Sequence, residues 1–196
     1  MTIAYSPSRL VVYVVSSDDN LAPNVTTGIC SLTVCKPVVR KQAVQGADWI
    51  IGMSTTKHGI DRIIYAMQVD EKLGYDAYYN DTRFADKKPS AAHPNGDNFF
   101  KLVNGELEIT TTKACHYGKP EKIKRDLNTP VAVLGKRFWY FGANAPRLPE
   151  ALRDTRIVTG NRRGHRYVDD PEVIAQLVAW LEANYEPGIH GQPRDV

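Results

Sequence analysis

The chain has 196 residues, of which 42% are hydrophobic and 24% are charged, and this composition excludes a disordered or fibrous protein. Its apolar runs, such as residues 10–15, are much shorter than the roughly 20 residues of a membrane helix, and no secretory leader opens it, so we expect a cytoplasmic protein without a membrane partner. The net charge of +3 is too small to indicate duplex binding by itself.

The first half of the chain predicts strands joined by irregular loops. Residues 9–16 are rich in β-branched side chains, which is typical of a buried strand. Residues 49–53 and 63–69 flank a polar connector and predict an antiparallel hairpin. A short helix is expected over residues 73–80, and residues 82–98 predict a long ordered loop, a kind of segment that is often functional.

Two tight hairpins are predicted in the second half. Asn104-Gly105, between two apolar segments, suits a type I′ turn. Gly135-Lys136, between residues 131–134 and 137–141, suits a type II′ turn.

Helices are expected over residues 120–127 and at the C-terminus. There, Asp170 provides a cap and Pro171 suits the first turn. An apolar stripe of helical periodicity follows, and Pro187-Gly188 ends the helix near Tyr185.

These elements predict the fold class. Hairpins with helices at intervals, without regular alternation of strand and helix, indicate α+β rather than a doubly wound sheet. We expect one domain over residues 1–196, with a curved antiparallel or mixed sheet or a partly open barrel. The C-terminal helix packs on it, and a short tail starts near residue 186.

The cysteines do not predict a disulfide or a metal site. Their count, three, is odd and low, so reduced thiols are expected. Cys30, Cys35, Cys115 and His116 have the chemistry of zinc ligands, but their spacing matches no standard zinc motif. No metal and no cofactor are therefore predicted, and Cys30 remains a candidate nucleophile with partners distant in sequence.

Polar and aromatic residues offer a candidate binding site, each with a structural alternative. Asp97 and Asn98 can bond a base edge or simply form a turn. Arg162 and His165 belong to a basic cluster that suits phosphate but equally a solvated loop. Aromatic side chains, among them Trp49, are candidates for base stacking or for the core.

An ordered series of short segments resembles the nucleotide modification associated domain 2 family over nearly the whole chain. The segments are Ala22-Pro23-Asn24, Gly28-Ile29-Cys30, Cys35-Lys36-Pro37 with Arg40, Asp48-Trp49-Ile50-Ile51-Gly52, Tyr65-Ala66-Met67, Asp81-Thr82-Arg83-Phe84, Gly96-Asp97-Asn98, Tyr140-Phe141-Gly142-Ala143-Asn144-Ala145-Pro146, Gly164-His165 and Gly188-Ile189-His190-Gly191-Gln192-Pro193. Ala47 stands before Asp48-Trp49, where a Gly-Asp-Trp-like run is expected for the family. The resemblance implies a context of nucleotide or DNA-base modification in phages and bacteria.

The resemblance also implies that the matching polar residues meet in one cleft. These residues are Asn24, Cys30, Arg40, Asp48, Arg83, Asp97, Asn98 and His165. In this hypothesis Asn24, Asp97 and Asn98 read base edges, Arg40, Arg83 and Arg162 hold phosphates, and Trp49 or Phe84 stacks on the base.

Three functions follow as hypotheses. The first is recognition of a nucleotide, or of a single-stranded or flipped base, on a fold like the PUA and EVE pseudo-barrels. The second is a transferase or hydrolase acting on a nucleotide, with Cys30 as nucleophile or Asp97 as base and His165 as acid. The third is a protein–protein adaptor in phage–host conflict, which predicts an exposed apolar patch.

Overall fold

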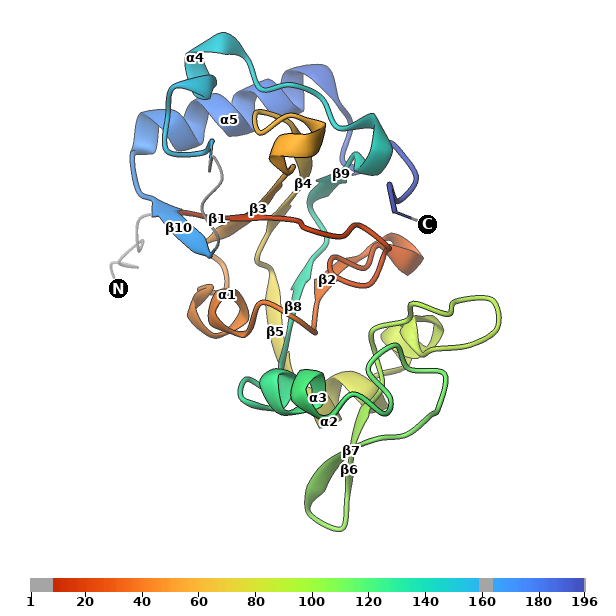
Figure 1. Ribbon diagram of the computed structural model, residues 1–196. Coiled ribbons are helices and arrows are strands. Elements are labelled where there is room, and N and C mark those ends of the chain that lie inside the picture. Colours follow the sequence, from red (N-terminus) through yellow and green to blue (C-terminus); the bar gives the residue numbers. More distant parts are fainter. Residues whose placement is uncertain (1–8, 159–163, 196) are drawn as a thin grey trace, which may run out of the picture.

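The computed structural model describes residues 9–158 and 164–195 (Figure 1). A six-stranded mixed sheet has the order β10-β1-β3-β4-β9-β11. Its strands are β1 (Leu10–Val14), β3 (Trp49–Met53), β4 (Ile63–Gln68), β9 (Phe138–Tyr140), β10 (His165–Val168) and β11 (Gly188–Ile189). The pairs β1–β3 and β9–β11 are parallel and the other pairs are antiparallel.

A second, three-stranded antiparallel sheet has the order β2-β8-β5. It contains β2 (Cys30–Leu32), β5 (Glu71–Gly74) and β8 (Val131–Gly135). The chain passes directly from one sheet to the other between β4 and β5 and between β8 and β9. Backbone hydrogen bonds from Asp70 to Leu134 and from Gln68 to Arg137 continue the pairing between these two passages. The predicted α+β class is confirmed, with open sheets over the described residues rather than a closed barrel.

Helices surround these sheets. They are α1 (Pro37–Gln42), α2 (Tyr75–Asn80), α3 (Pro120–Leu127), α4 (Glu150–Arg153) and α5 (Pro171–Asn184), with short 3₁₀ turns η1 (Thr26–Gly28), η2 (Thr56–His58), η3 (Thr82–Lys87) and η4 (Gly142–Asn144). Within the described residues no helix has the length and hydropathy needed to cross a membrane.

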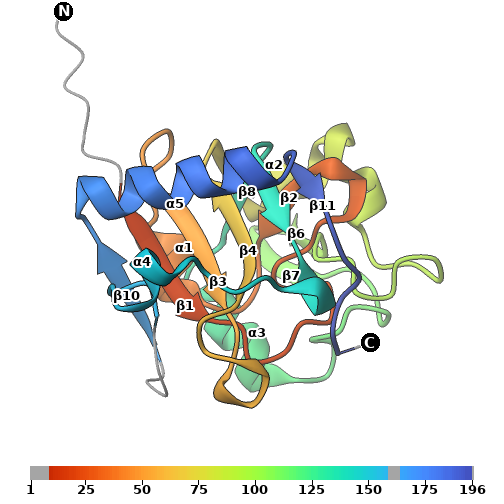
Figure 2. The same ribbon diagram turned by 90° about the horizontal axis from the view of Figure 1, so that it is seen from above.

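Helix α5 lies along one face of the six-stranded sheet, as Figure 2 shows. Asp170 caps it by accepting hydrogen bonds from the backbone N–H groups of Glu172 and Val173. The buried side chains of α5 belong to one apolar cluster with strand residues such as Leu10 and Val12. Each fully buried aliphatic side chain contributes about 1.5–3 kcal/mol to the free energy of folding, so these buried side chains hold α5 on the sheet.

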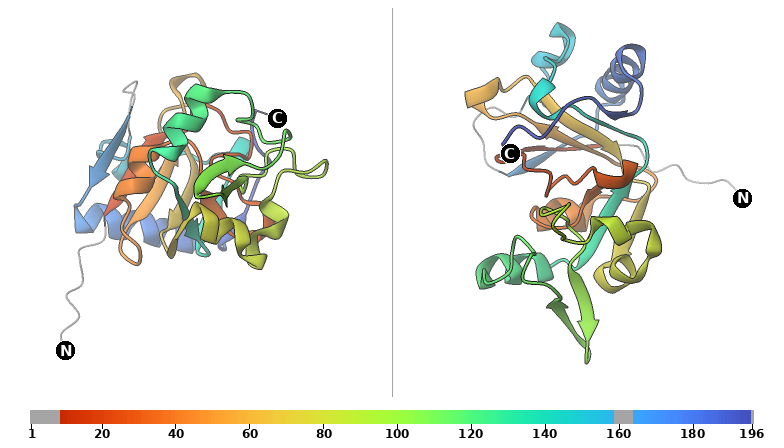
Figure 3. Two further views of the ribbon diagram at one scale, coloured as in Figure 1. Left: turned by 90° about the horizontal axis from the view of Figure 1, so that it is seen from below. Right: turned by 90° about the vertical axis from the view of Figure 1, so that its right-hand side faces the viewer.

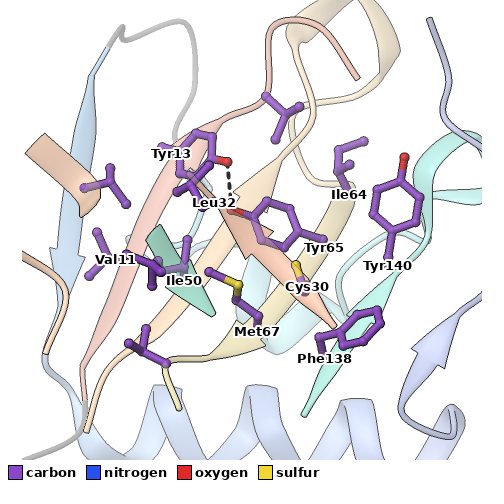
Figure 4. Close-up of a cluster of buried hydrophobic side chains, with 14 of the residues drawn as sticks. Val11, Tyr13, Cys30, Leu32, Ile50, Ile64, Tyr65, Met67, Phe138 and Tyr140 are labelled. Carbon is purple, nitrogen blue, oxygen red and sulfur yellow. Dashed lines mark hydrogen bonds between the residues drawn. The ribbon is translucent and has the colours of Figure 1, made fainter. Parts of the chain in front are cut away.

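The opposite face of that sheet carries a second core (Figure 4). Successive side chains of a strand point to opposite faces, so Val11 and Tyr13 enter this core while their neighbours face α5. Cys30 enters it from β2. At its centre the hydroxyl groups of Tyr13 and Tyr65 form a buried hydrogen bond of 2.7 Å.

One predicted hairpin is confirmed and the other is wrong. Strands β6 (Phe100–Val103) and β7 (Glu106–Ile109) pair around Asn104-Gly105, both with positive φ, and project from the body of the protein (Figure 1, Figure 3). Strands β8 and β9 instead belong to different sheets. Gly135 is needed there for close approach, because a Cβ atom would lie 2.5 Å from the carbonyl oxygen of Gln68.

Candidate functional site

A surface pocket of about 420 Å³ forms where three loops meet. Its volume lies in the range of small-molecule sites, roughly 300–1,000 Å³. The loops come from the segment after β1, from the segment before β6 and from the C-terminal tail. Its lining residues are Asp19, Asn20, Thr26, Ala92, His93, Pro94, Asn95, Gly96, Gln192 and Pro193.

Asparagine side chains join the first two loops. The Nδ2 atom of Asn24 donates to the carbonyl oxygens of Asn20 at 2.9 Å and Asn95 at 3.1 Å. Asn95 returns a hydrogen bond from its own Nδ2 to the carbonyl oxygen of Asp19 at 2.6 Å. Because Asn24 is fully buried, it supports the pocket from beneath rather than lining it.

A buried lysine lies below Asn24. The Nζ atom of Lys87 donates to Asn24 Oδ1 at 2.8 Å, to the Asn24 carbonyl at 3.1 Å, to the Ile29 carbonyl at 2.8 Å and to Ser31 Oγ at 3.0 Å. Burial lowers the pKa of Lys87, and the nearby Asp97 carboxylate opposes that shift. Sequence reasoning missed Lys87, because Asp86-Lys87-Lys88 has the composition of a solvated loop.

Asp97 completes this buried network. Its Oδ2 accepts from Ser31 Oγ at 2.7 Å and from Thr33 Oγ1 at 2.9 Å, and its Oδ1 accepts from the Tyr78 hydroxyl at 2.9 Å. Burial raises the pKa of Asp97, while Lys87 and these donors lower it. Both carboxylate oxygens are therefore engaged inside the protein, directly after Gly96 of the pocket wall.

Asn98 and Phe84 lie beside this network. Asn98 Nδ2 donates to the carbonyl oxygens of Tyr78 and Phe84, each at 3.1 Å. The Phe84 ring is fully buried and packs 4.7 Å from the Tyr78 ring. The structure thus brings together Asn24, Phe84, Asp97 and Asn98 as the support of the pocket.

The C-terminal tail forms the third wall of the pocket, where several hydrogen bonds hold it against the rest of the protein. The backbone N–H of Ala143 donates to the Gln192 carbonyl at 2.8 Å. The buried Asp18 accepts from the Tyr140 hydroxyl at 2.7 Å and from the backbone N–H of Arg194 at 3.1 Å. Burial raises the pKa of Asp18, and the hydrogen bonds from Tyr140 and Arg194 oppose the shift.

Three other predicted residues have structural partners elsewhere. Arg40 is fully buried, and its guanidinium donates to the backbone carbonyl oxygens of Cys35, Asp126 and Val131. Asp48 accepts from the Val44 N–H at 2.8 Å and forms an ion pair with Arg9 at 3.0 Å. Trp49 stacks on Trp139 with ring centroids 6.0 Å apart, inside the core beneath α5.

Three further predicted residues, Arg83, Cys30 and His165, also lie outside the pocket lining. Arg83 forms surface ion pairs with Glu71 and Asp81 at 3.0 and 2.6 Å. Cys30 lies in the core, where burial raises the pKa of its thiol to about 12. His165 is on the edge strand β10, 3.1 Å from the Tyr167 hydroxyl. Arg162 lies outside the described residues.

Comparison with known proteins identifies the family of this chain. The family model described as nucleotide modification associated domain 2 matches residues 7–196, nearly the entire sequence. No curated protein and no solved structure is significantly similar to the chain. The description of the family associates the chain with nucleotide modification. The chain belongs to the nucleotide modification associated domain 2 family.

Proposed function

We propose that the pocket binds a nucleobase, either free as a nucleoside or presented by a single-stranded or flipped nucleotide. The observation that carries this proposal is the chemistry of the lining. It combines a carboxylate, amides and an imidazole with the apolar surfaces of Ala92, Pro94 and Pro193. Such a mixture suits a flat heterocycle that has hydrogen-bonding edges and an apolar face.

The charge of the lining favours a base over a phosphate. Among the described residues that line the pocket there is no lysine and no arginine, whereas Asp19 contributes a carboxylate. A phosphate held against Asp19 would meet like charge without compensation. An exocyclic amino group would instead donate to that carboxylate, so the proposed ligands are amino-bearing bases such as adenine, cytosine or their modified forms.

Two side chains are free to contact the ligand. The His93 imidazole and the Gln192 amide make no hydrogen bond to other described residues, while the asparagines of the pocket are held by their neighbours. A glutamine amide offers both a donor and an acceptor, which is the pattern that pairs with an adenine edge. We assign base recognition to Gln192 and His93.

The arrangement of the sheets supports a module that holds a base rather than one that binds a long duplex. The two open sheets are joined through β4–β5 and β8–β9, and loops line the pocket. We propose that this architecture is related to the PUA and EVE pseudo-barrels, which place a base in a pocket between loops. Phosphate and sugar then lie outside the pocket, toward solvent.

A thermal-shift experiment with nucleosides tests the proposal. The protein is heated with adenosine, cytidine, uridine and thymidine, and with the corresponding monophosphates. A ligand at 100 times its dissociation constant adds about 2.7 kcal/mol of apparent stability. We expect a stabilising shift with amino-bearing nucleosides and no larger shift with their monophosphates.

Matched variants locate the binding. Gln192→Ala is expected to weaken nucleoside binding about tenfold, the effect of losing one to two hydrogen bonds. Gln176→Ala removes an exposed glutamine on the outer face of α5 and is expected to bind like the wild type. Equal loss in both variants, or a stabilising effect of inorganic phosphate alone, contradicts a base-binding pocket.

A further inference from the structure

A positively charged surface covers the segment before α3 and the outer side of that helix, which lies on the side of the molecule opposite to α5 (Figure 1). Residues 111–128 contain five of the 25 basic residues of the chain and two of its 22 acidic residues, so this segment accounts for the whole formal net charge of +3. The rest of the chain carries equal numbers of both signs. All five basic side chains are exposed, and we call them the basic surface: Lys113, Lys119, Lys122, Lys124 and Arg125.

The charges of the basic surface are not neutralised within the described part of the chain, where none of the five side chains forms an ion pair with a carboxylate. Lys119 Nζ donates to the Cys115 carbonyl oxygen at 2.8 Å, and Arg125 Nη2 lies 3.7 Å from Cys35 Sγ. The acidic Glu121 is exposed on the same helix. Residues three apart on a helix are neighbours, so the like charges of α3 repel one another and an anionic partner relieves that repulsion.

Asp126, the other acidic residue of the segment, does not offset the surface charge. It is fully buried, with Oδ2 2.6 Å from His116 Nδ1 and Oδ1 3.7 Å from the Arg40 guanidinium. Burial lowers the pKa of His116, but the hydrogen bond with Asp126 is the largest opposing effect and the pKa rises to about 11. The imidazole is therefore protonated at neutral pH, and Asp126 is neutralised from inside the protein.

An exposed aromatic ring lies within the same segment. Tyr117 is 52% exposed, whereas the other described phenylalanine, tryptophan and tyrosine side chains are buried or half-buried. Its backbone N–H donates to the Ala114 carbonyl oxygen at 2.9 Å, and both Ala114 and His116 are buried. The fold thus presents the Tyr117 ring to solvent on a backbone that its neighbours hold in place.

We propose that the basic surface and Tyr117 bind the phosphates and one base of a single-stranded nucleic acid. Proteins that bind single strands combine positive charge along the backbone with aromatic side chains on which bases stack. Tyr117 lies between Lys113 and Lys119 in the chain. In a duplex the faces of the bases are already stacked on one another, so a ring that stacks on a base selects a single strand.

The direction of the apolar side chains of α3 favours a nucleic acid over an acidic membrane. A helix that binds to a membrane surface inserts its apolar face between the lipids. The apolar residues Ile123 and Leu127 of α3 instead pack inward, against the hydrophobic cluster that contains Phe99. The outer side of the helix keeps the charged residues, which suit a phosphate backbone.

The basic surface complements the pocket but does not depend on it. None of its residues lines the pocket, and the described lining of the pocket contains no lysine and no arginine. Leu21, which follows the pocket residue Asn20, belongs to the same hydrophobic cluster as Ala114 of the basic segment. The two loops share one core, and phosphates that find no cation in the pocket find cations on the basic surface.

Fluorescence anisotropy tests the proposal with a fluorescein-labelled oligothymidylate about 12 nucleotides long. Thymine has no exocyclic amino group, so this probe does not engage the pocket as proposed above, and the two proposals can fail separately. We expect the logarithm of the affinity to fall against the logarithm of the salt concentration with a slope of about −3, as roughly four phosphate contacts on a single strand predict. The double variant Lys122→Gln/Lys124→Gln should reduce the slope to about half.

Matched variants locate the strand. Lys57→Gln/Lys136→Gln removes the same charge at two other exposed positions and should keep the wild-type slope. Tyr117→Ala should weaken binding at least about fivefold, the lower end for stacking on one base, with an unchanged slope. Tyr117→Phe keeps the ring and should bind like the wild type. All of these side chains are exposed, so the variants should fold and keep the thermal shift with adenosine.

Three results overturn the proposal. The first is no binding of the oligothymidylate at low salt, including the case in which vesicles of phosphatidylserine and phosphatidylcholine bind the protein instead. The second is an equal loss of slope in the two double lysine variants. The third is a Tyr117→Ala variant that binds like the wild type, or a duplex of the same length that binds more tightly than the single strand.

Discussion

The ammonium group of Lys87 lies 2.8 Å from Asn24 Oδ1, with both side chains fully buried beneath the pocket. Asn24 in turn holds the carbonyl oxygens of Asn20 and Asn95, which belong to two different pocket loops. A charge in the core is therefore connected by two hydrogen bonds to the walls of the pocket. We therefore expect the shape of the pocket to depend on Lys87.

Replacing Lys87 with methionine tests this dependence. Lys87→Met removes the donor shared by Asn24 Oδ1, the Ile29 carbonyl oxygen and Ser31 Oγ, and it removes the positive charge that lowers the pKa of Asp97. Leaving a buried hydrogen-bonding group without its partner costs about 1–3 kcal/mol of unfolding free energy. Urea denaturation measures this loss. Lys88→Met is the control, since Lys88 lies over the Tyr79 ring at 4.0 Å, and we expect it to cost less than about 1 kcal/mol. An equal loss of unfolding free energy in Lys87→Met and Lys88→Met would contradict a structural role of the buried lysine.

The sequence predicted correctly those elements that depend on interactions between residues close together in the chain. The cap at Asp170 and the Asn104-Gly105 turn each act within a few residues, and both elements form where the sequence indicated them. The predicted turn at Gly135 was wrong. The missing side chain of Gly135 instead allows the backbone of Gln68, on another strand, to approach closely. A glycine in the sequence does not by itself distinguish a tight turn from close packing against another strand.

The candidate site was predictable only in part for the same reason. Asn24 and Asp97 were expected to lie near each other, and the structure connects both through Ser31. Lys87 is 63 residues from Asn24 in sequence, and nothing in its neighbours distinguishes it from a solvated lysine. His116 Nδ1 lies 2.6 Å from Asp126 Oδ2, and this contact depends on how the irregular segment 110–119 folds against α3, which no local pattern predicts.

Substitution of Gly96 should distort the pocket wall. A Cβ atom at this position would lie 2.5 Å from the Lys87 carbonyl oxygen and 2.7 Å from Pro89 N, both of them backbone atoms that cannot turn aside. We expect Gly96→Ala to lower the unfolding free energy by about 1–3 kcal/mol and to weaken nucleoside binding. Thermal denaturation and calorimetric titration measure the two effects. Gly74→Ala meets open space and should change neither, and similar effects of the two variants would contradict the steric argument.

The cap of α5 should contribute measurably to stability. Asp170→Ala removes the acceptor of the Glu172 and Val173 N–H groups and is expected to cost about 0.5–2 kcal/mol. Asp169→Ala, at an exposed neighbouring position, should stay within about 0.5 kcal/mol of the wild type. Chemical denaturation at neutral pH compares the two variants. A larger loss from Asp169 than from Asp170 would show that the cap is assigned to the wrong residue.

The pairing of His116 with Asp126 predicts a stability that falls at alkaline pH. Since the pKa of His116 rises from 6.5 to about 11 on folding, the folded protein retains a proton that the unfolded chain releases. The stabilisation from this proton is complete below pH 6.5 and is lost as the pH rises toward 11. His116→Gln lacks this contribution at every pH. The difference in unfolding free energy between wild type and His116→Gln, measured by urea denaturation at about pH 6 and about pH 9, should therefore shrink at the higher pH. A difference that is unchanged or grows with pH would show that the imidazole is neutral in the folded protein.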